Sequence, residues 1–130
     1  MAKIADIKRM RELLTMFFCV ADSAHLAHLN TRSFAQHKAL GNFYEFAVEF
    51  KDRLIEYMIG MGYVGNIQLN SVEANEDPVS EAQDALEAIE EFAEEADDST
   101  LENMAADFQE ALGKLKYMLM LNKINHEREN

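Results

Sequence analysis

Three histidines and two carboxylates in the first half of the chain have the spacing of metal ligands. His25 and His37 are twelve residues apart with His28 between them, Asp52 follows fifteen residues after His37, and Glu56 comes four residues later. Imidazole and carboxylate groups are the ligand types that suit iron, manganese and zinc. The five residues are therefore the candidate ligands of a divalent metal ion.

The elements that must position these residues are helices. Apolar residues recur at steps of three and four in four segments, a pattern typical of buried helical faces. We expect helices over residues 4–29, 34–60, 78–96 and 100–121, and a frayed polar tail over 122–130. Ser33, Asp77 and Ser99 stand where helix N-caps are expected.

The connections between the expected helices predict how they are arranged. The turn between the first two helices and the turn between the last two are short, whereas residues 60–77 form a long link without periodicity. Two antiparallel hairpins joined by one long crossover are the connectivity of ferritin-like proteins. We therefore predict an all-α, ferritin-like four-helix bundle as a single domain over residues 1–130.

Composition narrows the class of function. The formal net charge is −12, and residues 54–113 hold sixteen acidic residues and no lysine or arginine. Such a balance argues against nucleic-acid binding, which requires phosphate neutralisation. No apolar window is long enough for a membrane span, and a single cysteine fits a reducing compartment. The expected location is the cytoplasm.

The spacing on the second helix separates the candidate ligands into two groups. His37 and Asp52 lie about 60° apart around the axis but roughly 22 Å apart along it, at about 1.5 Å per residue. One ion cannot reach both within one chain. Asp52 and Glu56 are one turn apart and can chelate together, as can His37 with a histidine of the first helix. We therefore expect a two-fold dimer, formed through the first two helices, to bring the two groups together.

The series His25, His37, Asp52 and Glu56 resembles the ferroxidase pattern of the Dps proteins, or mini-ferritins. The resemblance implies an iron site between two-fold-related subunits, with histidines from one and carboxylates from the other. It also implies oxidation of Fe²⁺ and further assembly into a shell. His28 is the alternative ligand from the first helix. The segment AHLAHLNTRSFAQHKALGNFYEF is also similar to small ferritin-like proteins of tailed bacteriophages, which implies a host cytoplasm.

A structural interpretation of the same residues stays open beside the metal site. Histidines on apolar helical faces are more often hydrogen-bonded structural residues than ligands. His28, His37 and Tyr44 would then form a buried polar cluster that fixes the first hairpin. Asp52 would pair with a cation such as Arg53 or Lys51 of a neighbouring chain. The function would be that of a non-catalytic phage bundle that binds an unidentified phage or host protein.

Overall fold

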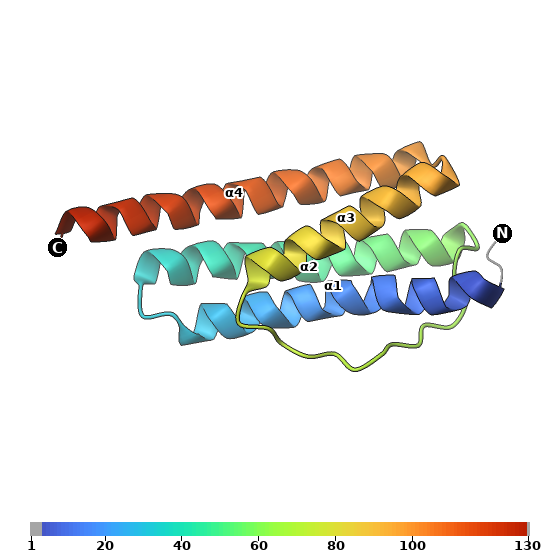
Figure 1. Cartoon of the computed structure of the whole chain (residues 1–130), viewed down its shortest axis with the longest axis horizontal. Coiled ribbons are helices and arrows are strands. Elements are labelled where there is room, and N and C mark those ends of the chain that lie inside the picture. Colours follow the sequence, from blue (N-terminus) through green and yellow to red (C-terminus); the bar gives the residue numbers. More distant parts are fainter. Residues whose placement is uncertain (1–3, 130) are drawn as a thin grey trace.

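Four helices form one bundle in the computed structural model of the chain. The structure describes the backbone of residues 4–129 and the side chains of residues 7–121. The helices are α1 (Ile4–Asn30), α2 (Phe34–Gly60), α3 (Pro78–Ala96) and α4 (Ser99–Glu129), and the described part of the chain contains no strand. α1 packs against α2 and α3, and α4 packs against the same two helices (Figure 1).

The order of the helices in space follows the predicted connectivity. α1 and α2 form one antiparallel hairpin and α3 and α4 form another, while residues 61–77 run back along α1, so that α3 is parallel to α2 (Figure 1). Two hydroxyls of α1 hold this crossover. Thr15 Oγ1 accepts a hydrogen bond from the Asn70 N–H at 3.0 Å, and Ser23 Oγ accepts one from the Asn75 N–H at 2.7 Å.

The helix ends show which local predictions hold. Ser33 caps α2 by accepting the Gln36 N–H, and Asp77 caps α3 by accepting the Ser80 N–H. The predicted cap of α4 is wrong, because Asp98 rather than Ser99 accepts the N–H of the first turn, from Leu101 at 3.0 Å. A carboxylate in this position adds favourable interaction with the helix dipole.

The far end of α4 also differs from the prediction. The helix does not stop near residue 121 but continues to Glu129. Residues 122–129 contain neither glycine nor proline, so nothing in this segment terminates the helix even though its apolar stripe has ended. α4 consequently extends past the start of α3 and past the turn between α1 and α2 (Figure 1).

Aromatic rings from three helices form the centre of the core. Phe17, Phe50 and Phe108 are buried, and the Phe108 ring lies 5.4 Å from Phe17 and 5.0 Å from Phe50 between centroids. Burying one such side chain stabilises the fold by about 1.5–3 kcal/mol. The core fixes the register of α1 against α2. It thereby sets the last turns of α1 beside the first turns of α2, where the histidines lie.

Candidate metal-binding site

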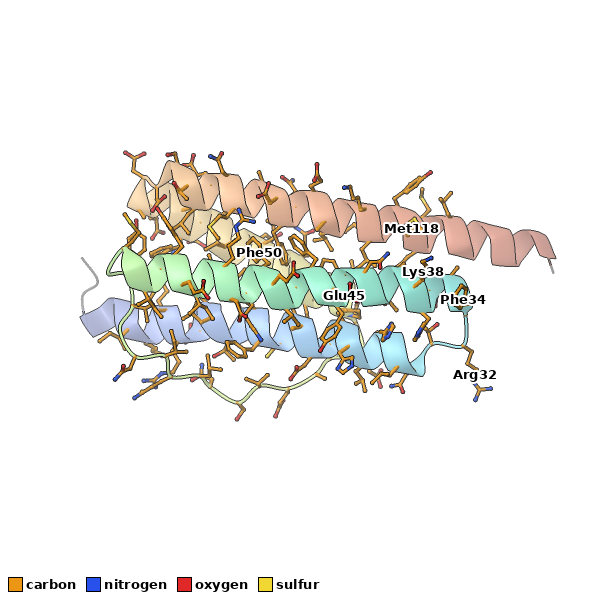
Figure 2. All side chains as sticks on the ribbon, turned by 180° about the vertical axis from the view of Figure 1, so that it is seen from behind. Arg32, Phe34, Lys38, Glu45, Phe50 and Met118 are labelled. Carbon is orange, nitrogen blue, oxygen red and sulfur yellow. The ribbon has the colours of Figure 1, made fainter. Side chains whose placement is uncertain are left out.

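The hairpin of α1 and α2 brings the three predicted histidines together. His25 and His28 lie in the last turns of α1, and His37 lies in the first turns of α2, across the turn of residues 31–33. All three side chains are half-buried. Figure 2 shows this end of the bundle, where Phe34 marks the start of α2.

His28 and His37 are joined by two reciprocal hydrogen bonds. His28 Nδ1 lies 2.6 Å from the His37 carbonyl oxygen, and His37 Nδ1 lies 2.8 Å from the His28 carbonyl oxygen. The His28 carbonyl belongs to the last turn of α1 and has no acceptor role within that helix. His37 therefore satisfies a carbonyl at the C-terminus of α1, and the pair ties the two helices together beside their turn.

The imidazole rings form a row. The rings of His28 and His37 stack with centroids 3.8 Å apart and planes 19° apart, and the His25 ring follows with its centroid 6.4 Å from that of His28. The Tyr44 ring stacks on His25 at 4.2 Å. Tyr44 therefore contacts His25, whereas the structural interpretation of the sequence had grouped it with His28 and His37.

The hydrogen bonds determine which ring nitrogen can bind a metal. A carbonyl oxygen only accepts, so Nδ1 of His28 and Nδ1 of His37 must each carry the hydrogen. In the neutral ring Nε2 then keeps its lone pair. Histidines that bind metals usually donate their other ring N–H to a carbonyl or carboxylate, which fixes the tautomer. His28 and His37 each donate the Nδ1 hydrogen to a backbone carbonyl in this way, which leaves Nε2 for a metal ion.

The two predicted carboxylate ligands lie further along α2. Asp52 and Glu56 are exposed and one helical turn apart, and roughly 22 Å of helix separates Asp52 from His37, at about 1.5 Å per residue. Among the side chains of residues 7–121 no group of three or more His, Cys, Asp and Glu is placed to hold a metal ion. One chain thus brings the histidines together and leaves the carboxylates apart from them.

The cations suggested for Asp52 have other contacts within this chain. Arg53 Nη2 lies 3.0 Å from Asp107 Oδ2 of α4, and Lys51 Nζ lies 4.2 Å from the centroid of the Phe18 ring. Across the described side chains, neither Asp52 nor Glu56 takes part in an ion pair or a side-chain hydrogen bond. Both carboxylates therefore face solvent with their oxygens available to a ligand.

Comparison with known proteins places the sequence in a family. The chain matches the model of a family of unknown function, DUF5856, over residues 28–119. The chain belongs to the DUF5856 family. The matched region contains His28, His37, Asp52 and Glu56 and leaves His25 outside it. Neither curated proteins nor solved structures give a match. Among the described helices of this DUF5856 chain, none has the length and apolar character needed to cross a membrane.

A second polar cluster of the DUF5856 chain lies at the opposite end of the bundle and was not predicted. The buried carboxylate of Asp98 accepts hydrogen bonds from the Tyr57 hydroxyl at 2.9 Å, from the Tyr63 hydroxyl at 2.7 Å and from the Leu101 N–H. The cluster joins the end of α2 and the start of the crossover to the turn between α3 and α4. The sequence signal was the Asp97-Asp98 pair before α4, but nothing local indicates the tyrosines.

The environment of this cluster shifts two pKa values in opposite directions. Burial alone would raise the pKa of Asp98, but hydrogen bonds from Tyr63, the Leu101 N–H and Tyr57 outweigh it, and the pKa lies below its ordinary value. The hydrogen bond to Asp98, followed by burial and the negative charge, raises the pKa of Tyr63 to about 12. Both shifts favour a carboxylate that accepts from a neutral phenol. The cluster is therefore a structural clasp rather than a proton-transfer site.

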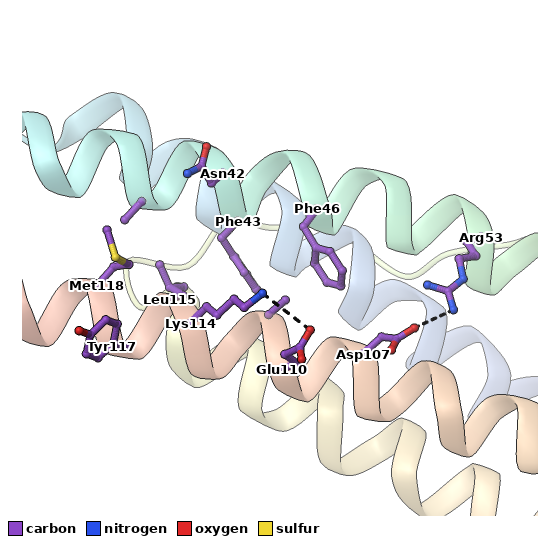
Figure 3. A pocket seen from close by; sticks show the side chains of 12 residues that line it. Asn42, Phe43, Phe46, Arg53, Asp107, Glu110, Lys114, Leu115, Tyr117 and Met118 are labelled. Carbon is purple, nitrogen blue, oxygen red and sulfur yellow. Dashed lines mark hydrogen bonds and ion pairs between the residues drawn. The ribbon is translucent and has the colours of Figure 1, made fainter.

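An apolar groove of the DUF5856 chain lies between α2 and α4. Its volume is about 520 Å³, and Phe43 and Phe46 of α2 face Leu115 and Met118 of α4 across it (Figure 3). The ion pair between Arg53 and Asp107 bridges the two helices at one end. The groove contains no histidine and is separate from the candidate metal ligands.

Proposed function

We propose that this chain is a ferritin-like, metal-binding bundle in which two copies share each site for iron or a similar divalent metal. One copy contributes His25 and His37, and the other contributes Asp52 and Glu56. The observation that supports this most is the hydrogen bond from His37 Nδ1 to the His28 carbonyl at 2.8 Å. It leaves the Nε2 lone pair of His37 for a ligand and holds the ring in one orientation.

The stacked rings argue against His28 and His37 as joint ligands of one ion. A bound metal ion lies close to the plane of its imidazole, about 2.1 Å from the nitrogen. His28 and His37 are nearly parallel, with centroids 3.8 Å apart, so their in-plane lone pairs do not converge on one ion. We take His25 as the second imidazole ligand from the spacing of the ligand series, and its ring, whose plane is 24° from that of His28 at a centroid distance of 6.4 Å, must turn to meet the ion. His28 acts as a positioning residue, because its carbonyl fixes the His37 tautomer.

The two carboxylate ligands that the second copy would contribute fit the same proposal. Asp52 and Glu56 are exposed on one face of α2, and neighbours at this spacing can bind one ion together. Two imidazoles and two carboxylates form a mixed nitrogen and oxygen donor set that suits iron, manganese or zinc. With Fe²⁺ as substrate, the reaction at such a site is oxidation to Fe³⁺, and oxygen or peroxide takes up the electrons.

The activity is tested by following ferric absorbance. Fe²⁺ is added to the full-length protein without oxygen, and oxygen is then admitted to wild type, Asp52→Ala and the control Asp84→Ala. Asp84 is an exposed carboxylate of α3, so this control removes the same charge elsewhere. We expect Asp52→Ala to slow oxidation at least about tenfold, a loss of about 1.4 kcal/mol of transition-state stabilisation. Equal rates in all three proteins contradict the enzymatic claim.

A second candidate function is binding of a phage or host protein by a bundle without metal. The observation in its favour is the exposure of large apolar side chains on α4, among them Tyr117 at 56% and Met120 at 53%. Exposed apolar patches of this kind mark interaction sites. Metal analysis of the purified protein separates the two candidates. A chain that binds neither Fe²⁺ nor Zn²⁺ at micromolar concentration supports the second candidate.

A further inference from the structure

The outward face of α4 carries a glycine that the single chain does not explain. Gly113 lies in the interior of the helix and is exposed, and a Cβ atom built on it meets no other atom within 4 Å. Glycine in a helix interior is destabilising relative to alanine. Its backbone does permit close approach of another element. Among the residues that the structure describes, no such element lies within 4 Å of that Cβ position.

The side chains around Gly113 make the same face suited to another protein. Ala106, Tyr117 and Met120 lie seven residues before it and four and seven residues after it, and such steps fall on one side of a helix. All three are exposed. The face therefore has a small residue, Ala106, before its midpoint and the large side chains of Tyr117 and Met120 after it.

The charges of α4 are divided at the same midpoint. The half before Gly113 carries Glu102, Asp107 and Glu110, and the half after it, up to residue 121, carries Lys114 and Lys116. Figure 3 shows Glu110 and Lys114 on successive turns of the helix. Their ion pair is loose, at 3.8 Å, and both side chains are more than 70% exposed. A helix with this charge order is complementary to a second copy of itself in the antiparallel direction.

We propose that this face of α4 is an isologous interface with a second copy of the chain, antiparallel and centred on Gly113. Residues equally far before and after the centre then come to the same level. Ala106 lies level with Met120 of the second copy, and Glu110 lies level with Lys116 of the second copy. On each side of the centre one small residue meets a large one and one acidic residue meets a basic one, while the two glycines let the helices approach at the axis.

This interface is distinct from the one that the metal site needs. The proposed metal ligands belong to α1 and α2, whereas Gly113 is an exposed residue of α4, which belongs to the other hairpin (Figure 1). Two different two-fold contacts on one chain produce assemblies larger than a dimer. The α4 contact does not depend on metal, so it stands or falls separately from the proposed function.

The first test is the mass of the full-length protein in solution, by analytical ultracentrifugation over a range of concentrations. Gly113→Gln places a good helix former on the axis, and Gly60→Gln is the matched control, because a Cβ at Gly60 also meets nothing within 4 Å. We expect Gly113→Gln to weaken one association step at least about tenfold, or 1.4 kcal/mol, and the control to leave it unchanged. Circular dichroism confirms that both variants fold.

Charge exchange tests the direction of pairing. Glu110→Lys and Lys116→Glu are each expected to weaken the same association step, because like charges then face each other at one level. The two substitutions together restore opposite charges and are expected to recover it. Recovery by the double variant supports the antiparallel arrangement. A double variant as weak as the single ones contradicts it.

A cysteine at the axis provides a direct readout. The axes of packed helices are about 8–10 Å apart, so Cα atoms that face each other across the contact, as the two Gly113 Cα atoms would, are within reach of a disulfide. In a Cys19→Ser background, Gly113→Cys is expected to form a covalent dimer under mild oxidation, and Gly60→Cys is expected to stay monomeric on a denaturing gel. No covalent dimer, together with an association step insensitive to Gly113→Gln, overturns the proposal even if the metal site is real.

Discussion

The imidazole of His28 occupies the space that a side chain at position 41 would need. A Cβ atom built on Gly41 lies 2.7 Å from His28 Cε1 and 2.9 Å from His28 Nδ1. The ring cannot withdraw freely, because its Nδ1 is bonded to the His37 carbonyl at 2.6 Å. Gly41 is therefore part of the arrangement that holds the histidine pair.

Replacement of this glycine is expected to destabilise the hairpin. Gly41→Ala should lower the free energy of unfolding by about 1–3 kcal/mol, the usual effect of overpacking, although alanine is the better helix former. Gly60→Ala is the control, because its Cβ meets nothing within 4 Å. Urea unfolding of the three proteins measures the difference. A Gly41→Ala variant as stable as wild type would show that the His28 ring is not confined.

The Asp98 clasp is expected to contribute more than an ordinary N-cap. Asp98→Ala removes the acceptor of two phenol hydroxyls and of the Leu101 N–H, so we expect a loss of about 2–4 kcal/mol in the free energy of unfolding. Asp97→Asn is the control at the neighbouring acidic residue, which is exposed. The backbone of Asp97 has the left-handed conformation, with φ 51°, and asparagine tolerates that conformation. This control should remain within about 0.5 kcal/mol of wild type.

The clasp also predicts how stability depends on pH at the alkaline end. The pKa of Tyr63 is about 12 in the folded chain against 10.0 for the free group. A raised pKa means that the stabilisation is complete below pH 10 and is lost as the pH rises towards 12. Unfolding by urea at pH 8 and pH 11.5 should therefore show a smaller advantage of wild type over Tyr63→Phe at the higher pH. An equal advantage at both values contradicts the shift.

At acidic pH the contribution of the clasp to stability is lost as the pH falls, whereas at alkaline pH it is lost as the pH rises. The pKa of Asp98 lies below its ordinary value of 3.8 in the folded chain, so its stabilisation is present above that value and is lost as the pH falls through the lowered pKa. Asp98→Asn removes this dependence. The difference in unfolding free energy between wild type and Asp98→Asn should shrink on acidification from pH 6 to pH 3. A difference that stays constant would mean that the carboxylate is not preferentially stabilised in the folded state.

Helix bounds were predictable where apolar periodicity coincides with a capping residue. α2 begins after Ser33 and α3 after Asp77, as predicted, because a short polar side chain there accepts an N–H of the first turn. The start of α4 was ambiguous, since Asp98 and Ser99 are both good caps and only the burial of Asp98 decides between them. The end of α4 was missed because residues 122–129 carry no apolar stripe and no terminator.

The candidate site was predictable only where local sequence determines the positions of the residues. The gathering of His25, His28 and His37 follows from a short turn between two long helices. The order of the rings does not, because it depends on a close approach at Gly41 and on bonds to backbone carbonyls. In the Asp98 clasp, Asp98 contacts Tyr63, which lies 35 positions earlier in the sequence, and Tyr57, which lies 41 positions earlier. Contacts of that range follow from packing of the bundle and leave no local pattern.

The crossover is held to α1 by two hydroxyls, and removing one should loosen it locally. Ser23 is fully buried and accepts the Asn75 N–H at 2.7 Å, so Ser23→Ala leaves a backbone donor without its partner. We expect a loss of about 1–3 kcal/mol and faster hydrogen exchange at the Asn75 amide. Ser71→Ala, at an exposed position of the same segment, is the control. Unchanged exchange at Asn75 in Ser23→Ala would show that the hydroxyl does not hold the segment.

The shared metal site is tested most directly by mixing two inactive chains. One chain carries His25→Ala and His37→Ala, and the other carries Asp52→Ala and Glu56→Ala. Neither chain then retains both the histidine ligands and the carboxylate ligands. After unfolding and refolding together, half of the dimers formed at random are mixed, and each mixed dimer has one intact site. We expect the mixture to recover about one quarter of the wild-type Fe²⁺ binding, while each chain refolded alone binds none. A mixture that binds no more Fe²⁺ than the separate chains, in assemblies of wild-type mass, contradicts a site shared between two copies.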